Sequence, residues 1–252
     1  MRKPEFEFHS FSLTDIGRLR SHNEDSAGII KGPGYTLLCV FDGMGGHRKG
    51  ELASSMALNA FRDAFEPLTK TPSLTAAKRL IKETLTRANA QIFDTSKAVQ
   101  ECAGMGTTAV VAIVFAEQTL IANMGDSRCY TLKPRRVTLD QITVDDSYVE
   151  MLVKKGRITR QQARVHPDRN IITNALGIQE KMRVKFTQIP SDFSYLMLCS
   201  DGLYTMISDQ VIANVLRKDC DINSKVVTLV NAANDAGGKD NISVALIERR
   251  KI

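Results

Sequence analysis

Apolar residues follow two different periods along this chain, and the changes of period predict its elements. The run Tyr35–Phe41 is typical of a strand and leads into the glycine-rich stretch 42–46. Apolar residues then recur at helical spacing, at positions 52, 53, 56, 57, 60, 61, 64 and 65. After the turn at Pro72-Ser73 a second stripe of this kind comprises Ala77, Ile81, Leu85, Ala88 and Ile92. Two long consecutive helices are therefore predicted.

Short β-rich runs dominate the middle and the end of the chain. Three of them lie close together, at 107–115, 119–123 and 128–132. The tight turns between these three predict an antiparallel meander. Further strands are expected at 184–189, 195–199 and 242–247. Helices are expected after Ser208 and after Ser224, which are candidate N-caps. Because strands and helices are grouped, antiparallel sheets with helices on their faces are favoured over a parallel sheet.

The chain turns polar between Pro134 and Lys181 and carries two short helical patterns there, at 149–155 and 159–165. This stretch predicts a surface insertion at about 134–182. It is either a flap beside a functional site or a surface segment without a functional role. There is no internal repeat, low-complexity tract or Pro/Gly-rich linker. We therefore expect residues 1–252 to form a single domain.

The composition is that of a globular protein, with 43% apolar and 25% charged residues among 252. No apolar run approaches the roughly 20 residues that cross a bilayer, and the first residues are charged where a signal peptide is apolar. Five cysteines form no C-x-x-C pair, and Cys39 and Cys199 lie inside apolar runs. They indicate buried thiols in a reducing compartment, so we expect a cytoplasmic protein without a membrane segment.

The net charge of +6 suits an anionic partner such as a phosphoprotein or a nucleic acid. The basic clusters 133–136 and 249–251 are short and lack interleaved aromatic residues. Clusters of this kind are typical of a solvated surface rather than of a nucleic-acid footprint. We therefore expect no nucleic acid.

Acidic residues stand at the boundaries of the predicted strands. Asp42-Gly43 and Asp201-Gly202 each follow an apolar strand, and an Asp-Gly pair usually marks a hairpin turn. Here a helical pattern follows each pair, so a hairpin fits poorly. Further acids at such boundaries are Glu24, Asp25, Asp126 and Asp240. If these carboxylates converge at one end of a sheet, their repulsion requires cations.

All of these candidate ligands are oxygens, which select magnesium or manganese over zinc or copper. The four histidines show no metal-binding spacing such as H-x-x-x-H. Two hard cations about 4 Å apart lower the pKa of a bridging water and clamp the oxygens of an in-line displacement. Hydrolysis of phosphate monoesters, which is very slow without a catalyst, requires such a preformed positive charge.

Seven motifs occur in order along nearly the whole chain: 14–25 (TDIGRLRSHNED), 41–47 (FDGMGGH), 106–108 (GTT), 123–128 (NMGDSR), 166–170 (HPDRN), 200–203 (SDGL) and 239–241 (KDN). Together they resemble the type 2C metal-dependent protein phosphatases of the bacterial branch. The resemblance implies an α+β fold, a four-layer αββα sandwich of two antiparallel sheets flanked by helix pairs, with a flap insertion. It also implies that a water bridging two Mn²⁺ or Mg²⁺ ions hydrolyses phosphoserine and phosphothreonine in proteins. A monomer that opposes a Ser/Thr kinase is expected.

By this resemblance, Asp42 bridges both metals, Gly43 supplies its carbonyl, and Glu24 binds one metal. Asp201 and Asp240 bind the other metal. The supporting positions are Asp25 and Asn241. The motifs further imply that Asp126 recruits a third, weaker metal and that Arg20 holds the substrate phosphate. The implied catalytic residues are therefore Arg20, Asp42 and Asp201. A surface salt bridge from Arg20 to Glu24 or Asp25 is the structural alternative.

The sequence departs from the family pattern at two positions. Thr205 stands where many members have an acid, which predicts a looser third metal site. Met44 replaces a histidine that has been proposed as general acid in animal members, and the pattern does not transfer that role to His47.

Two other functional interpretations remain open at this point. Cys129 and Arg135 satisfy the C-x-x-x-x-x-R spacing of cysteine-dependent phosphatases, although 130–132 predicts a strand instead of a phosphate loop. A catalytically weak phosphoprotein-binding module on the same scaffold is the other alternative, but its expected signature is the loss of metal-binding acids. None of these acids is lost.

Overall fold

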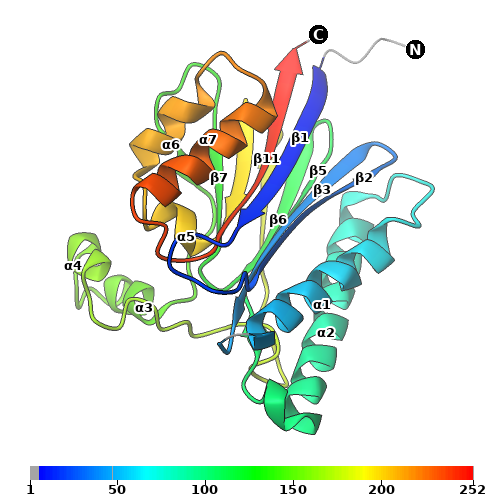
Figure 1. Ribbon diagram of the computed structural model, residues 1–252. Coiled ribbons are helices and arrows are strands. Elements are labelled where there is room, and N and C mark those ends of the chain that lie inside the picture. The colour runs from blue at the N-terminus through cyan, green and yellow to red at the C-terminus, as the bar shows by residue number, and fades with distance from the viewer. Residues whose placement is uncertain (1–5, 47, 252) are drawn as a thin grey trace.

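Two antiparallel sheets lie face to face between two layers of helices in the computed structural model, which describes residues 6–46 and 48–251 (Figure 1). In order across the first sheet the strands are β1 (Phe6–Asp15), β11 (Ile242–Lys251), β10 (Tyr195–Cys199), β7 (Arg128–Leu132) and β8 (Asp140–Gln141). In order across the second they are β2 (Asp25–Gly32), β3 (Tyr35–Met44), β5 (Ala109–Val114), β6 (Gln118–Met124) and β9 (Lys185–Pro190). The short β4 (Gly106–Thr107) pairs with the end of β3.

Helices cover the outer face of each sheet. The second sheet is covered by α1 (Arg48–Phe65) and α2 (Leu74–Ala98), and a short 3₁₀ turn, η1 (Gln100–Cys102), follows α2. The first sheet is covered by α5 (Asp201–Tyr204), α6 (Asp209–Leu216) and α7 (Ile222–Asp235). The predicted αββα sandwich is therefore confirmed. Within the described chain, no helix has the length and apolarity needed to cross a membrane.

Strand β3 shows how the sequence builds the layers. Leu37, Cys39 and Phe41 pack against α1 and α2, whereas Leu38 and Val40 pack into the layer between the sheets. This alternation is the period-2 geometry of a strand that is buried on both faces. It explains why the run 35–41 is continuously apolar.

Both helical stripes of the sequence form as predicted. All five residues of the second stripe are buried on α2, which begins after Ser73, whose side chain accepts a hydrogen bond from the Ala76 amide. Ser208 caps α6 in the same way. The prediction of a cap at Ser224 is wrong, because α7 begins earlier, with Asp221 as its N-cap, and Ser224 donates its hydroxyl to that carboxylate. Asp221 accepts a hydrogen bond from the Ser224 amide, so the helix starts about one turn earlier than expected.

The predicted three-strand meander is also wrong in part. β5 and β6 pair as expected, but β7 leaves this sheet and pairs with β10 in the other one. The short turn at Gly125, whose φ is 93°, carries the chain from one sheet to the other. Close spacing in sequence predicts adjacency of strands, but it does not distinguish a hairpin from a crossing between stacked sheets.

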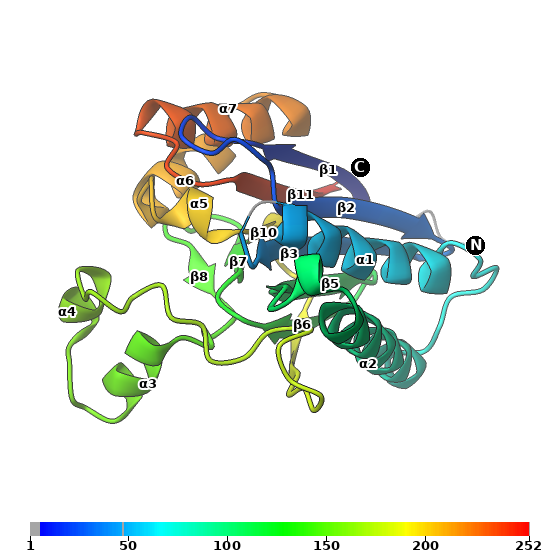
Figure 2. The ribbon, with the colours of Figure 1, turned by 60° about the horizontal axis from the view of Figure 1, so that its bottom comes forward.

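Three strands were missed, β1, β2 and the short β8. β1 pairs along its whole length with β11, so the first and the last strand lie side by side (Figure 1). The insertion contains both predicted helices, α3 (Tyr148–Lys154) and α4 (Arg160–Arg164), capped by Ser147 and Thr159. Its first part is tied to the body through β8, and the helices project from the side of the sandwich (Figure 2).

Candidate metal and phosphate site

Six acidic residues gather at one end of the two sheets, the lower end in Figure 1, and we call them the acidic cluster: Glu24, Asp25, Asp42, Asp126, Asp201 and Asp240. Each stands at or beside the end of a strand. The registers Asp25↔Asp42 and Asp15↔Ile242 place the β2–β3 and β1–β11 ends at this same end. The convergence expected from the sequence is therefore present.

Asp42 lies at the centre of the acidic cluster. It faces Asp25 across the β2–β3 pair, and its side chain lies within hydrogen-bonding distance of Asp201. Burial first, and then the charges of Asp25 and Asp201, raise the pKa of the Asp42 carboxyl well above its usual value. An arrangement of this kind is costly unless protons or cations neutralise it.

The neighbouring carboxyls are perturbed in the same direction. Burial raises the pKa of Asp25 to about 7, of Asp126 to about 8 and of Asp201 to about 6. Repulsion from the other acids adds to the rise in each case. One Asp126 carboxylate oxygen, Oδ1, is buried without a hydrogen-bond partner in the described chain. A buried orphan acceptor beside like charges fits a cation ligand.

Hydroxyl and amide groups hold the acids in place. Ser200 donates its hydroxyl to Asp25 Oδ2 at 2.7 Å, and the Asp42 amide donates to Thr108 Oγ1 at 3.0 Å. Asn241 accepts from the Glu24 amide at 2.8 Å and donates to the carbonyls of Ile16 and His22, both at 2.9 Å. Asn241 and Asp25 thus lie at supporting positions. The sequence motifs contained Ser200 and Thr108, but nothing in the pattern indicated their contacts.

Two glycines leave the space that Glu24 occupies. A Cβ on Gly50, in the first turn of α1, would lie 2.1 Å from Glu24 Oε2. A Cβ on Gly43 would lie 2.2 Å from the Gly50 carbonyl oxygen and 2.3 Å from that of Glu24. Glu24 therefore sits close to the start of α1, where the helix dipole favours a negative charge. Met44 follows at the end of β3, whereas His47 lies outside the described residues.

Arg20 lies at the edge of the acidic cluster. Its Nη2 donates to Asp240 Oδ2 at 2.8 Å, and this hydrogen bond raises the pKa of the guanidinium. The salt-bridge alternative named Glu24 or Asp25 as partners, and the partner found is Asp240. About half of the Arg20 side chain, 49%, is exposed.

A second guanidinium, on Arg128, links the Asp126 loop to the insertion. Its Nε and Nη2 bind both oxygens of Asp145 at 2.7 to 3.2 Å, and its plane stacks on the Tyr204 ring at 3.6 Å. The Tyr204 hydroxyl in turn donates to the Asp126 carbonyl at 3.1 Å. Arg128 therefore pairs with Asp145 and not with Asp126, and sequence reasoning had missed both Asp145 and Tyr204.

The donor set fits hard cations with a partly hydrated shell. Among residues 6–46 and 48–251, no three His, Cys, Asp or Glu side chains form a group that could hold an ion by themselves. Magnesium-type sites use only one or two carboxylates and complete their shell with water and other oxygens. The acidic cluster, in which one pair of acids meets at Asp42 and Asp201, matches that requirement.

The structure argues against Cys129 as a nucleophile. Its side chain is fully buried on β7, opposite Leu198 of β10, and burial raises the pKa of its thiol above the usual value. A reactive cysteine needs a lowered pKa and access to solvent. All five cysteines are free, and Cys39 and Cys199 are buried as predicted.

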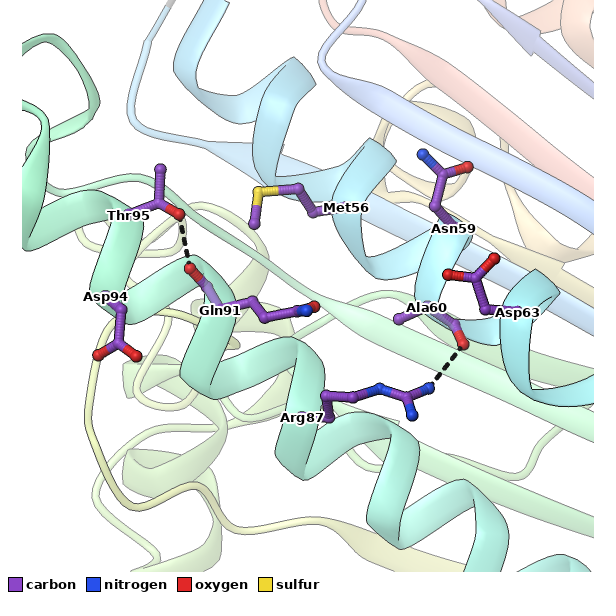
Figure 3. A pocket seen from close by; sticks show the side chains of 8 residues that line it. All are labelled: Met56, Asn59, Ala60, Asp63, Arg87, Gln91, Asp94 and Thr95. Carbon is purple, nitrogen blue, oxygen red and sulfur yellow. Dashed lines mark hydrogen bonds between the residues drawn. The ribbon is translucent and has the colours of Figure 1, made fainter.

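A hollow of about 540 Å³ lies away from these groups, between α1 and α2 (Figure 3). Its lining comprises Met56, Asn59, Ala60, Asp63, Arg87, Gln91, Asp94 and Thr95. Arg87 reaches across it to the Ala60 carbonyl at 3.3 Å. No member of the acidic cluster contributes to the hollow, so the candidate chemistry lies at the sheet ends.

Comparisons with known proteins agree with this geometry. The family model described as Protein phosphatase 2C matches residues 18–246. The serine/threonine phosphatase stp of Listeria monocytogenes is 37% identical over 243 residues, 96% of each chain. The protein phosphatase PhpP of Streptococcus pneumoniae is 36% identical over 237 residues, 93% of this chain and 95% of that one.

Solved structures share the fold over nearly the same extent. The serine/threonine phosphatase Stp1 of Staphylococcus aureus superposes with a TM-score of 0.90 at 34% identity, covering 96% of this chain and 95% of that chain. The catalytic domain of the protein phosphatase PstP, solved in complex with two manganese ions, gives 0.81 at 29% identity and covers 96% and 98%.

The raised pKa values predict how the metal-free protein responds to pH. In the folded state Asp25, Asp126 and Asp201 hold protons that the unfolded chain releases near pH 4. Their contribution to stability is therefore fully present below about pH 4 and is lost as the pH rises through 6 to 8. In urea unfolding with a chelator present, we expect this contribution to fall by about 1 kcal/mol per pH unit for each retained proton.

Manganese binding at pH 6.5 should release protons for the same reason. Titration calorimetry in buffers of different ionisation enthalpy measures that release. Stability independent of pH, together with no proton release, would contradict the raised pKa values.

Proposed function

Because the chain belongs to the protein phosphatase 2C family, we propose that the acidic cluster is its catalytic metal centre. The chain is a metal-dependent protein serine/threonine phosphatase, and its substrates are phosphorylated proteins. The proposed ligands of two tightly bound ions are Glu24, Asp42, Asp201, Asp240 and the Gly43 carbonyl. The observation that carries this assignment is the burial of Asp42 beside Asp25 and Asp201, whose pKa values are raised as well.

Manganese is the metal found in a related structure, and we propose that Mg²⁺ also binds. When bound, the two ions supply the positive charge that activates a water molecule for attack on phosphorus. The chain's own residues fix where that charge lies. Asp42 is held through its amide by Thr108, Asp25 is held by Ser200, and Asn241 fixes the Glu24 backbone. Such preorganisation avoids reorganisation during the reaction.

We assign Arg20 to the substrate phosphate. One of its donors stays on Asp240, and the exposed donors offer the planar fork that phosphate oxygens accept. The hydrogen bond to Asp240 also sets the position of the guanidinium at the rim of the metal centre.

Asp126 is the proposed ligand of a third, weaker ion, supported by its unpartnered buried oxygen. Thr205 stands where an acid is common in the family, and its hydroxyl donates to the Asp201 carbonyl at 2.7 Å instead of facing an ion. A third ion would therefore have one carboxylate ligand fewer than in family members with an acid at this position, which supports weaker binding of that ion.

The cellular setting follows from the activity. A phosphatase for phosphoserine and phosphothreonine opposes a Ser/Thr kinase, and we propose that the protein acts as a monomeric single catalytic domain in the cytoplasm. Five free thiols support a reducing compartment. A general acid is not assigned, because Met44 cannot donate a proton.

Removing a central ligand tests the metal centre directly. Asp42→Asn and Asp201→Asn should each lower kcat by more than about 100-fold, the upper end of the cost of losing an outer-shell partner. With a chelator present, both variants should melt at or above the wild-type temperature, because a repelling charge is gone. Calorimetry should show weakened manganese binding. Normal turnover in either variant would refute the ligand assignment.

Arg20→Ala should leave manganese binding largely intact and lower kcat/KM by about 10-fold to 100-fold, the value of hydrogen bonds to a charged group. Arg20→Lys should recover only part of the loss, because an ammonium lacks the paired donors. The inhibition constant of free phosphate separates the roles. Equal constants in wild type and Arg20→Ala would show that Arg20 serves only as a partner of Asp240.

Asp126→Ala should spare the two tight ions and shift the manganese dependence of activity to higher concentration. The exposed acid Asp192, which pairs with Lys133, provides the matched control as Asp192→Ala. Activity is titrated with manganese in both variants. A curve for Asp126→Ala that overlays wild type would make Asp126 structural.

A further inference from the structure

An exposed leucine stands next to Arg20 in a loop that is firmly held. Leu19 is 71% exposed, yet its amide and that of Arg18 both donate to the Gly238 carbonyl, at 3.3 and 2.7 Å. Arg20 continues this contact by binding Asp240. Because these contacts fix the loop, the exposure of Leu19 is a property of the fold. The side chain stands beside the acidic cluster, where a substrate must approach.

Two cations flank this leucine, and we call Arg18, Leu19 and Lys239 the ledge. Arg18 and Lys239 are exposed, and neither forms an ion pair in the part of the chain that the structure describes. An unpaired cation on a surface is commonly just solvated. Here, however, both lie on loops that also carry proposed phosphate-binding and metal-binding residues.

The insertion carries a second, larger cationic surface. Segment 148–171 contains six Lys and Arg residues against two Asp and Glu residues. Arg160 pairs with Glu150 at 3.2 Å. The other five are exposed and form no ion pair with any described residue: Lys154, Lys155, Arg157, Arg164 and Arg169. We call these five, together with Val165 at 79% exposure, the flap surface.

The base of the insertion is anchored to the loop that carries Asp126. The Asp146 amide donates to the Gly125 carbonyl at 2.8 Å, and Asn174 donates to Asp146 Oδ2 at 2.8 Å. An isolated bridge between Ser147 and Ile172 ties the outgoing and returning chains together. The flap surface is therefore attached at the acidic cluster, and α3 and α4 project from that end of the sheets (Figures 1 and 2).

Two surfaces of the same composition thus border one site. Arginine combined with exposed apolar side chains is typical of protein interfaces, whereas a purely solvated face is polar throughout. From the ledge and the flap surface we infer that the enzyme prefers phosphoproteins with acidic residues flanking the phosphorylated serine or threonine. The inference rests on the proposed function, because it takes the acidic cluster as the place where phosphate is hydrolysed.

The size of the effect follows from the exposure of the cations. A single exposed ion pair changes an affinity by up to about 5-fold. Several cations acting on two or three acidic residues should give a preference of about 10-fold in kcat/KM. Salt should reduce this preference, because the Debye length falls from about 10 Å at 0.1 M to well under half of that at 1 M.

The test uses two phosphothreonine peptides that differ only in having glutamate or glutamine on both sides of the phosphothreonine. With saturating manganese we expect kcat/KM to favour the glutamate peptide by about 10-fold at low salt and by under about 3-fold at 1 M. Equal values for the two peptides at low salt would overturn the inference.

Charge removal on the protein locates the preference. The variant R18Q/K154Q/K155Q removes three cations from the ledge and the flap surface. The control K31Q/K70Q/K82Q removes three exposed lysines of β2, of the α1–α2 connection and of α2, and so has the same net charge. The preference for the glutamate peptide should drop to under about 3-fold in the first variant and stay at the wild-type value in the control. An equal loss in both would overturn the assignment to these surfaces.

Hydrolysis of a small aryl phosphate separates this inference from the proposed function. That substrate has no flanking residues, so its kcat/KM should be the same in wild type, variant and control. A wild type that hydrolyses the aryl phosphate but ignores the flanking charges would refute the inference alone. Loss of aryl phosphatase activity in D42N, with the wild type active, tests the metal centre independently.

Discussion

Repulsion among buried carboxylates is the constraint on which the rest of this structure depends. Asp25 and Asp201 lie close enough to Asp42 for each to raise its pKa, in surroundings where burial already disfavours charge. The few neutral hydrogen bonds around these groups orient them but do not offset the cost of bringing them together. The free energy that does so comes from elsewhere, from three apolar layers that bury Phe61 and Leu85 on one side, Leu196 between the sheets and Leu229 on the other side. The sandwich therefore has to be stable enough to tolerate an unfavourable charge arrangement at one end.

The supporting side chains around the acidic cluster are either neutral or cationic, and the two kinds lie in different places. Neutral groups such as Thr108, Ser200 and Asn241 lie among the acids and orient them. The guanidinium of Arg20 binds Asp240 at the edge, and that of Arg128 is turned away onto Asp145. A fixed cation inside the acidic cluster would compete with metal ions for the carboxylates. This arrangement leaves the carboxyl groups at the centre free to exchange their protons for metal ions.

The sequence predicted most of this because its strongest signals are local. The apolar stripes of α1 and α2 and the acids that follow Phe41 and Ser200 each depend on neighbours within a few residues. Among the features that escaped, three are long-range. The crossing of β7 to the other sheet is decided by β10, the pairing of β1 by β11, and the partner of Arg20 by Asp240, which is 220 residues away. The cap of α7 is a smaller miss of another kind, since Asp221 and Ser224 compete locally for one role.

Acidic groups are concentrated at one site of this protein, whereas the chain as a whole carries a net positive charge. The chain as a whole carries +6, yet it gathers carboxyl groups in its acidic cluster, where the raised pKa values of Asp25, Asp42 and Asp126 keep these groups protonated until cations replace the protons. At short range the cluster attracts divalent metals, and once they are bound its charge no longer repels a phosphate. At longer range the unpaired Arg18, Lys154 and Arg164 act on the whole anionic substrate, because fields from a protein surface extend about a Debye length into solvent. Chemistry and recognition are thereby assigned to separate groups. The outer helices of the insertion can then change in sequence without disturbing the acids, since the insertion is tied to the loops and strands that carry them through Asp145, Asp146 and Leu176.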